Sequence, residues 1–150
     1  MAKIIALCGK ICAGKSTLAR KLRDELNAVI LNSDELTLAL PFDHDETSPV
    51  IRPYLRRKAV EIARAGANVI LDCGFWTRAD RDEVRAFFAE AGFELEWKYI
   101  SVTDEEWQRN IAARNEKVLH GEENSYFVDE GLAQKCLKLF EEPQADENMG

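Results

Sequence analysis

The stretch Lys3-Ile-Ile-Ala-Leu-Cys8, followed by Gly9-Lys-Ile-Cys-Ala-Gly14-Lys15-Ser16, decides the fold of this chain of 150 residues. The first part is an apolar run of strand length, which is typical of a strand covered on both faces in a parallel sheet. The second part satisfies the pattern G-x-x-x-x-G-K-[ST] and opens a segment with leucines at every fourth position, Leu18, Leu22 and Leu26. A buried strand, a glycine-rich turn and an amphipathic helix are therefore predicted in succession.

The glycine-rich turn predicts a phosphate-binding loop. Gly9 and Gly14 let backbone N–H groups curl around phosphate oxygens, and the helix N-terminus adds unpaired donors and a partial positive charge. We expect Lys15 to reach the β- and γ-phosphates of a nucleotide and the Ser16 hydroxyl to ligate Mg²⁺. The alternative is a strand-to-helix turn that binds no ligand. The predicted nucleotide-binding residues are Gly9, Lys10, Ile11, Cys12, Ala13, Gly14, Lys15, Ser16 and Thr17.

Strands and helices are predicted to alternate along the rest of the chain. Further strands are expected at residues 28–31, 68–72 and 95–99, and the last of these looks half-exposed and nearer an edge. Helices are expected at residues 15–26, from near Pro53 to 66, and at 78–91, 103–115 and 130–141, with a short helical piece before Pro41. The polar segments 41–49 and 116–126 predict a surface loop and a mobile loop.

This alternation predicts an α/β fold of three layers with a mainly parallel sheet. The acidic segment 146–150 brings no further apolar run, so a final strand is expected to be absent.

Composition excludes several classes of protein. The chain is 46% hydrophobic and 31% charged, so it can bury a core and is not a disordered segment. A net charge of -7 has the wrong sign for a general binder of nucleic acids or anionic membranes. No apolar run approaches the roughly 18 residues that a membrane-spanning helix needs. The length predicts a single domain, 1–150.

The four cysteines favour a reduced, cytoplasmic compartment, because they form no C-x-x-C pair and a core of this size needs no disulfides. Cys12 lies in the phosphate loop, where the helix N-terminus could lower its pKa.

Two aspartates follow predicted strands and should lie at the carboxyl edge of the sheet, where open α/β sheets bind ligands. Asp72 ends the strand 68–72 and would hold Mg²⁺ directly or through water; alternatively it caps the following turn. Asp34 follows the strand 28–31 and suits the general base that a phosphotransferase needs for an acceptor hydroxyl. The alternative is that Ser33-Asp34-Glu35 only caps a short helix.

These segments occur in an order that resembles a known family. The order is the phosphate loop, Ser33-Asp34-Glu35, the stretch 69–81, Ala112-Ala-Arg114-Asn and Phe140-Glu-Glu-Pro143. It resembles small ATP-dependent P-loop kinases, a group that is similar to zeta toxins, chloramphenicol phosphotransferase and the 5′-hydroxyl kinase domain of polynucleotide kinases. The resemblance covers nearly the whole chain, although only the phosphate loop is specific by itself. It implies a three-layer P-loop kinase-like domain with a parallel sheet. The first strand should lie centrally, flanked by the third and fourth, with the second outside the third, in the order 2-3-1-4.

The resemblance implies roles for individual residues. Asp34 would be the general base, and Arg109 and Arg114 would be arginines of a mobile lid, about residues 114–128, that clamp the phosphates. These two arginines could otherwise be solvated helix surface. Polynucleotide kinases of this kind carry an arginine three residues after the catalytic aspartate, whereas this chain has Thr37, which disfavours a nucleic-acid substrate. Ala13 replaces a glycine or serine, which is tolerable if its φ is negative.

The expected function is transfer of the γ-phosphoryl group of Mg·ATP to a hydroxyl of a small-molecule acceptor. The alternatives are a nucleotide-binding regulatory ATPase that acts on a protein partner and a nucleic-acid 5′-hydroxyl kinase. An acceptor pocket for an anionic substrate, or alternatively an exposed helix start, could be formed by Arg52, Tyr54, Arg56 and Arg57. Arg81 could contact substrate, but we favour an exposed helix face that it shares with Arg78 and Arg85, paired with Asp80 and Asp82.

Overall fold

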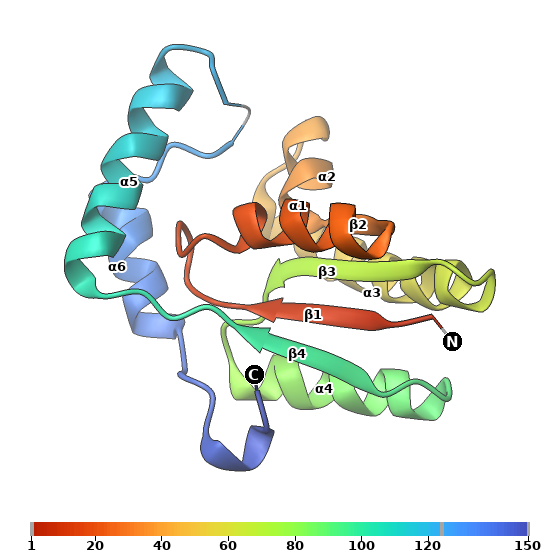
Figure 1. Ribbon diagram of the computed structural model, residues 1–150. Helices are drawn as coiled ribbons and strands as arrows, with labels where there is room; N and C mark the ends of the chain where they lie inside the picture. The colour runs from red at the N-terminus through yellow and green to blue at the C-terminus, as the bar shows by residue number, and fades with distance from the viewer. Residues whose placement is uncertain (1, 124, 150) are drawn as a thin grey trace.

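The structure, a computed structural model, describes residues 2–123 and 125–149; Asn124, within the predicted lid, and residues 1 and 150 of the predicted domain lie outside the described residues. Its sheet has four parallel strands, β1 (Ile4–Cys8), β2 (Ala28–Asn32), β3 (Asn68–Gly74) and β4 (Leu95–Tyr99). Their order is β2-β3-β1-β4, so the predicted parallel sheet and its strand order are confirmed (Figure 1). The register sets Asp72 of β3 opposite Leu7 of β1 and Asn32 of β2.

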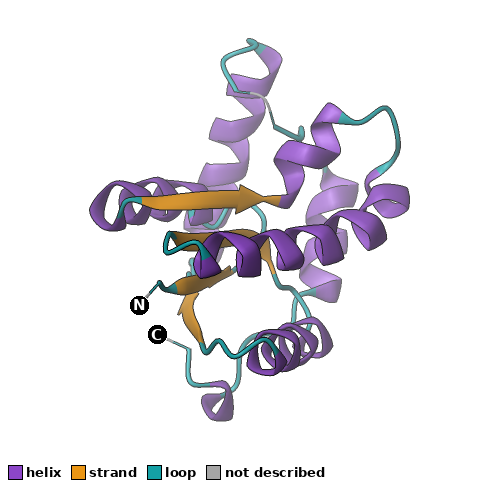
Figure 2. Ribbon diagram, turned by 90° about the vertical axis from the view of Figure 1, so that its right-hand side faces the viewer, coloured by secondary structure: helices purple, strands orange, loops and turns teal. Residues whose placement is uncertain are grey.

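Helices cover both faces of this sheet, as expected for strands that are apolar on both sides (Figures 1 and 2). The leucines of α1 (Lys15–Leu26) pack on one face, against Ile5 and Leu7 of β1. Helices α3 (His44–Arg64) and α4 (Arg78–Glu90) pack on the other face, around Ile4, Ala6 and Leu71. The predicted three layers are therefore present.

Two further helices lie beyond the carboxyl ends of the strands, α5 (Asp104–Leu119) and α6 (Glu130–Leu139) (Figure 1). Helix α5 holds the phosphate loop in place. The buried Trp107 donates its indole N–H to the carbonyl of Ile11 at 2.6 Å, and the Asn110 side chain donates to the carbonyl of Cys12 at 2.9 Å. The loop is thus fixed by its own helix α1 and by a helix almost a hundred residues later in the chain.

The predictions for two helix boundaries are wrong. Helix α3 begins at His44 and not near Pro53, so most of the predicted loop 41–49 is helical and both prolines lie inside the helix. Pro49 and Pro53 each remove one N–H donor, but the acidic first turn of α3 suits a helix N-terminus and the buried Ile51 and Leu55 anchor the helix.

Helix α5 likewise continues to Leu119 instead of ending near Asn115. Glu116 and Lys117 are polar but favour helix, and the chain turns only at Gly121, whose φ is +69°. The predicted mobile loop 116–126 is therefore helical in its first part.

The prediction of an exposed Arg81 is wrong as well. Its side chain is fully buried and pairs with Glu147 at 2.7 Å, while it also donates to the carbonyl of Phe75 at 2.9 Å. Glu147 belongs to the short 3₁₀ helix η1 (Ala145–Glu147) and also accepts from Arg85, whereas the exposed Arg78 pairs with Asp146. The acidic C-terminal segment thus packs on the arginines of α4. No helix in the described part of the chain could span a membrane.

Candidate active site

A cavity of about 680 Å³ lies at the carboxyl ends of the strands. A volume of this size is typical of small-ligand sites. Side chains from the phosphate loop, the end of β3, helices α3, α5 and α6, and α2 (Ser33–Ala39) line it. Of the predicted nucleotide-binding residues, those that line the cavity are Ile11, Cys12, Gly14, Lys15 and Ser16; Gly9, Lys10, Ala13 and Thr17 do not.

The backbone of the phosphate loop explains its residue types. A Cβ at Gly9 would lie 3.0 Å from the carbonyl oxygen of Ile100, so a side chain there would require the backbone after β4 to shift. Gly14 has a φ of +103°, which favours glycine. Ala13 is not among the residues with positive φ, in agreement with the condition set by the sequence, but Cys12 is, with a φ of +60°. No sequence pattern had indicated a left-handed residue at this position.

The Lys15 ammonium lies within the loop and donates to the carbonyls of Gly9 at 3.1 Å and Lys10 at 2.7 Å. Burial lowers the pKa of Lys15, against the opposing effect of the carboxylates of Asp72 and Asp34. The two carboxylates favour the charged form of Lys15, and an ammonium at this position of the loop is suited to bind the oxygens of a phosphate group.

Ser16 and Asp72 meet at the predicted metal position. The Ser16 hydroxyl donates to Asp72 Oδ2 at 3.2 Å, and the Asn32 amide donates to the same oxygen at 3.1 Å. Burial raises the pKa of Asp72, while Lys15 and the bond from Ser16 oppose this shift. A hydroxyl and a carboxylate are the hard oxygen ligands that Mg²⁺ prefers, and adjacent ligands in its octahedral shell lie about 3 Å apart. The two side chains therefore fit a magnesium ion.

Asp34 lies in the first turn of α2 and lines the same cavity as Lys15. The helix cap is provided by Asn32, whose side-chain oxygen accepts from the backbone N–H of Glu35 at 3.1 Å. One amide thus caps α2 with its oxygen and holds Asp72 with its nitrogen. The alternative that Ser33-Asp34-Glu35 serves as the cap does not apply, because the cap lies one residue earlier.

The two predicted lid arginines differ in position. Arg114 lines the cavity from α5, whereas Arg109 is exposed and does not line it. Next to Arg114, the amide of Asn115 makes two bonds with the backbone of Val128, of 2.7 and 2.6 Å. These bonds tie the end of the predicted lid, 114–128, to its start.

Asn32, Trp76 and Tyr126 are among the lining residues that the sequence interpretation missed. Asn32 ends a strand beside Asp72. The available signal in the sequence was a polar residue directly after the apolar run 28–31. Trp76 and Tyr126 line the cavity from the turn after β3 and from the predicted lid, and no local pattern marked them. Tyr126 also meets His44 of α3 edge-on, with ring centroids 6.3 Å apart.

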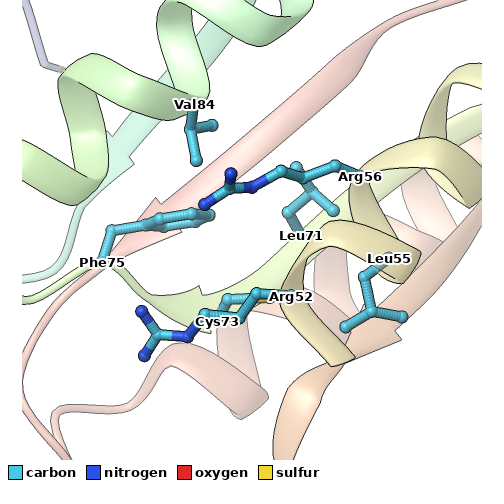
Figure 3. A pocket seen from close by; sticks show the side chains of 7 residues that line it. All are labelled: Arg52, Leu55, Arg56, Leu71, Cys73, Phe75 and Val84. Atoms are coloured by element: carbon cyan, nitrogen blue, oxygen red, sulfur yellow. The ribbon is translucent and has the colours of Figure 1, made fainter. Parts of the chain in front are cut away.

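A second, much smaller crevice separates α3, β3 and α4 (Figure 3). Its volume of about 10 Å³ has room for about one water molecule. Arg56 extends its guanidinium between Phe75 and Val84, whereas the guanidinium of Arg52 points away from Leu55. Arg56 pairs with Glu83 and does not line the large cavity, so of these two arginines only Arg52 reaches it.

The expectation for Cys12 is wrong. The residue is 5% exposed, and burial raises its pKa instead of the helix N-terminus lowering it.

A family model described as an AAA domain matches residues 4–143. A search of curated proteins found no significant match. Similar solved structures include a sugar kinase from Janibacter sp. HTCC2649, with a TM-score of 0.69 at 18% identity over 100% of this chain and 84% of that one.

A gluconokinase from Sinorhizobium meliloti 1021 gives a TM-score of 0.68 at 16% identity, over 96% of this chain and 78% of that one. A chain of the Pnkp1/Rnl/Hen1 RNA repair complex gives 0.73 at 20% identity, over 92% of this chain and 43% of that one. At these identities the likeness establishes a P-loop kinase-like fold.

Proposed function

Since the chain belongs to the AAA-domain family whose model its residues 4–143 match, we propose that it is an ATP- and Mg²⁺-dependent kinase acting on a hydroxyl of a small molecule. One observation carries the proposal: Asp34 lines the same cavity as Lys15 and Ser16. A carboxylate beside the phosphate site, outside the metal pair, suits a base for an acceptor hydroxyl, whereas a hydrolytic switch mainly needs to orient water.

Lys15, Ser16 and Asp72 would hold Mg·ATP. The Lys15 ammonium would exchange its bonds to the loop carbonyls for bonds to phosphate oxygens, and the backbone N–H groups of the loop would surround the same phosphates. Bound between Ser16 and Asp72, Mg²⁺ would offset the negative charge of the phosphates.

In the transfer step, Asp34 would accept the proton of the acceptor hydroxyl while that oxygen attacks the γ-phosphorus. The bond from the γ-phosphorus to the bridging oxygen breaks, and ADP leaves with the electron pair. Arg114 would stabilise the charge on the transferring group, because a guanidinium forks across phosphate oxygens. Arg109 would join it only if α5 moved toward the cavity.

Residues 114–128 would act as the lid that excludes water from this step. Tyr126 supports this role, because it spans from the lid to His44 of α3 and lines the cavity. Opening the lid would break that contact while the two bonds between Asn115 and Val128 hold its base.

The test is release of ADP from Mg·ATP, with and without pooled hydroxyl acceptors, for the wild type and for Asp34→Asn. The pools are sugars, nucleosides, aminoglycosides and 5′-hydroxyl oligonucleotides. We expect one pool to stimulate the wild type and not the variant, while both bind nucleotide equally. If no pool stimulates turnover and Asp34→Asn changes nothing while ATP still binds, a regulatory ATPase is the better assignment.

A further inference from the structure

The acceptor end of the cavity, away from the phosphate loop, is built from the start of α3, α2 and the turn after β3, with one side of α6. Its charged lining residues are Asp34, Asp43, Asp45, Asp80, Arg52 and Lys135. Four carboxylates therefore accompany two cations at this end, whereas Lys15, Arg114 and the carboxylate of Asp72 lie at the phosphate end.

Both cations are already engaged by carboxylates of the same wall. Arg52 pairs with Asp80 at 3.1 Å, and Lys135 pairs with Asp45 at 3.6 Å. An anionic acceptor would have to separate one of these pairs and leave its carboxylate facing the negative ligand. This arrangement disfavours the anionic acceptor that the arginines after residue 51 allowed on sequence grounds.

Asp34 and Asp43 are different, because within residues 2–123 and 125–149 neither has a cationic side chain within 4.0 Å. Asp43 is the N-cap residue of α3, yet its side chain makes no capping bond. The wall thus keeps two carboxylates that form no ion pair within the described part of the chain, although Asp34 also acts electrostatically on the more distant Lys15.

Aromatic side chains line the same space. Trp76, Tyr126 and His44 come from three different segments. The faces of tryptophan and tyrosine rings attract cations, and they also pack on the apolar faces of sugar rings. The carboxylates and the aromatic rings of this cavity therefore favour, independently of each other, a ligand with a positive charge.

We propose that the acceptor is a hydroxyl compound that carries an ammonium group, such as an amino sugar or an aminocyclitol. Asp43 holds the ammonium group and Asp34 faces the hydroxyl that is phosphorylated. The assignment of Asp34 to the hydroxyl rests on the proposed kinase function. The binding of the ammonium group by Asp43 does not depend on it.

Binding is measured first, by calorimetry in the presence of Mg²⁺ and a non-hydrolysable ATP analogue. The probes are kanamycin, glucosamine, glucose and gluconate, the last three being matched in size and differing in charge. We expect kanamycin and glucosamine to bind at least about tenfold more tightly than glucose, and gluconate to bind most weakly. If kanamycin and glucosamine bind no more tightly than glucose and gluconate, the proposal is wrong.

Variants locate the charge. Asp43→Asn should remove most of the preference for the cationic probes, and Asp43→Lys should reverse it toward gluconate. The matched control is Asp104→Asn, which changes an exposed aspartate at the start of α5 that does not line the cavity, and it should keep the preference. If Asp104→Asn lost the preference for cationic probes to the same extent, the net charge of the protein would explain the preference. The assignment of Asp43 would then be wrong.

Turnover is then read separately as release of ADP. Cation-selective binding without phosphoryl transfer would support the charge assignment and reject the kinase. Phosphorylation of gluconate in preference to glucosamine would support the kinase and reject the charge assignment.

Discussion

The hydroxyl of Ser16 lies 3.2 Å from the carboxylate of Asp72, although 56 positions separate the two residues in the sequence. The sheet creates this contact, because β3 pairs with β1 and ends beside the start of α1. Both side chains are polar and meet in a partly buried place. A magnesium ion bound between them would explain why they lie together.

Loss of either side chain should remove the effect of Mg²⁺ on nucleotide binding. In Ser16→Ala and in Asp72→Asn we expect the affinity for ATP with Mg²⁺ to fall to the value measured with EDTA. Titration of a fluorescent ATP analogue measures this, with Ser101→Ala as control because Ser101 is exposed and lies outside the cavity. A variant that keeps the full Mg²⁺ effect would refute the metal position.

Arg114→Ala should lower kcat by at least about 100-fold, because it removes a guanidinium from the cavity that holds the transferring phosphoryl group. Arg109→Ala, on the exposed surface of the same helix, should change kcat less than about threefold. Steady-state kinetics of the two variants decide between them. A large loss in both would mean that α5 moves into the cavity during turnover.

Glu147→Gln should destabilise the fold by about 3 kcal/mol, because it leaves the buried Arg81 without its charge partner. Chemical denaturation measures this change. The control is Asp146→Asn, at the residue before Glu147, which breaks an exposed ion pair with Arg78. It should lower the free energy of unfolding much less. Equal effects of the two variants would contradict the buried position of Glu147.

The same carboxylate predicts an acid transition. Burial alone would raise the pKa of Glu147, but hydrogen bonds from Arg81 and from the backbone of Gln144 outweigh it and lower the pKa from 4.5 to about 2. A carboxyl whose pKa is lower in the folded protein stabilises it fully above its unfolded pKa and loses that contribution as the pH falls. The free energy of unfolding should therefore decline from about pH 4.5 to about pH 2 in the wild type, and much less in Glu147→Gln.

The thiols should react slowly in the folded protein. Burial raises the pKa of all four cysteines, that of Cys8 and of Cys73 to about 11. Iodoacetamide at neutral pH, followed by mass measurement of the intact protein, should modify none of them quickly and all four after denaturation. Fast alkylation of Cys12 alone would mean that the helix N-terminus prevails over burial.

Local sequence patterns were sufficient for the parts of the fold that depend on neighbouring residues. The apolar run before Gly9 and the leucines of α1 predict their elements, and the alternation of strands and helices predicts a parallel sheet. The strand order followed from the resemblance to P-loop kinases. Asp72 and Asp34 were likewise predicted at the carboxyl ends of the strands. Asp72 ends one predicted strand, and Asp34 comes soon after another.

Features that depend on distant partners could not be predicted. Arg81 looked like one of three solvated arginines because its partner Glu147 lies 66 positions later. The start of α3 was hidden by two prolines whose cost is offset by the burial of Ile51 and Leu55. The left-handed Cys12 accepts a hydrogen bond from Asn110 of α5, a partner that no short window of sequence around Cys12 contains.

The central position of β1 has a consequence for how the protein is made. β1 has its hydrogen-bonding partners in residues 69–74 and 95–99, and the loop that follows β1 is held by Trp107 and Asn110. During synthesis, at roughly 5–20 residues per second, the ribosome releases the loop seconds before these partners exist. The phosphate loop is therefore translated well before it can become competent for binding. A nascent chain that ends before Asn110 should not be retained on an ATP column.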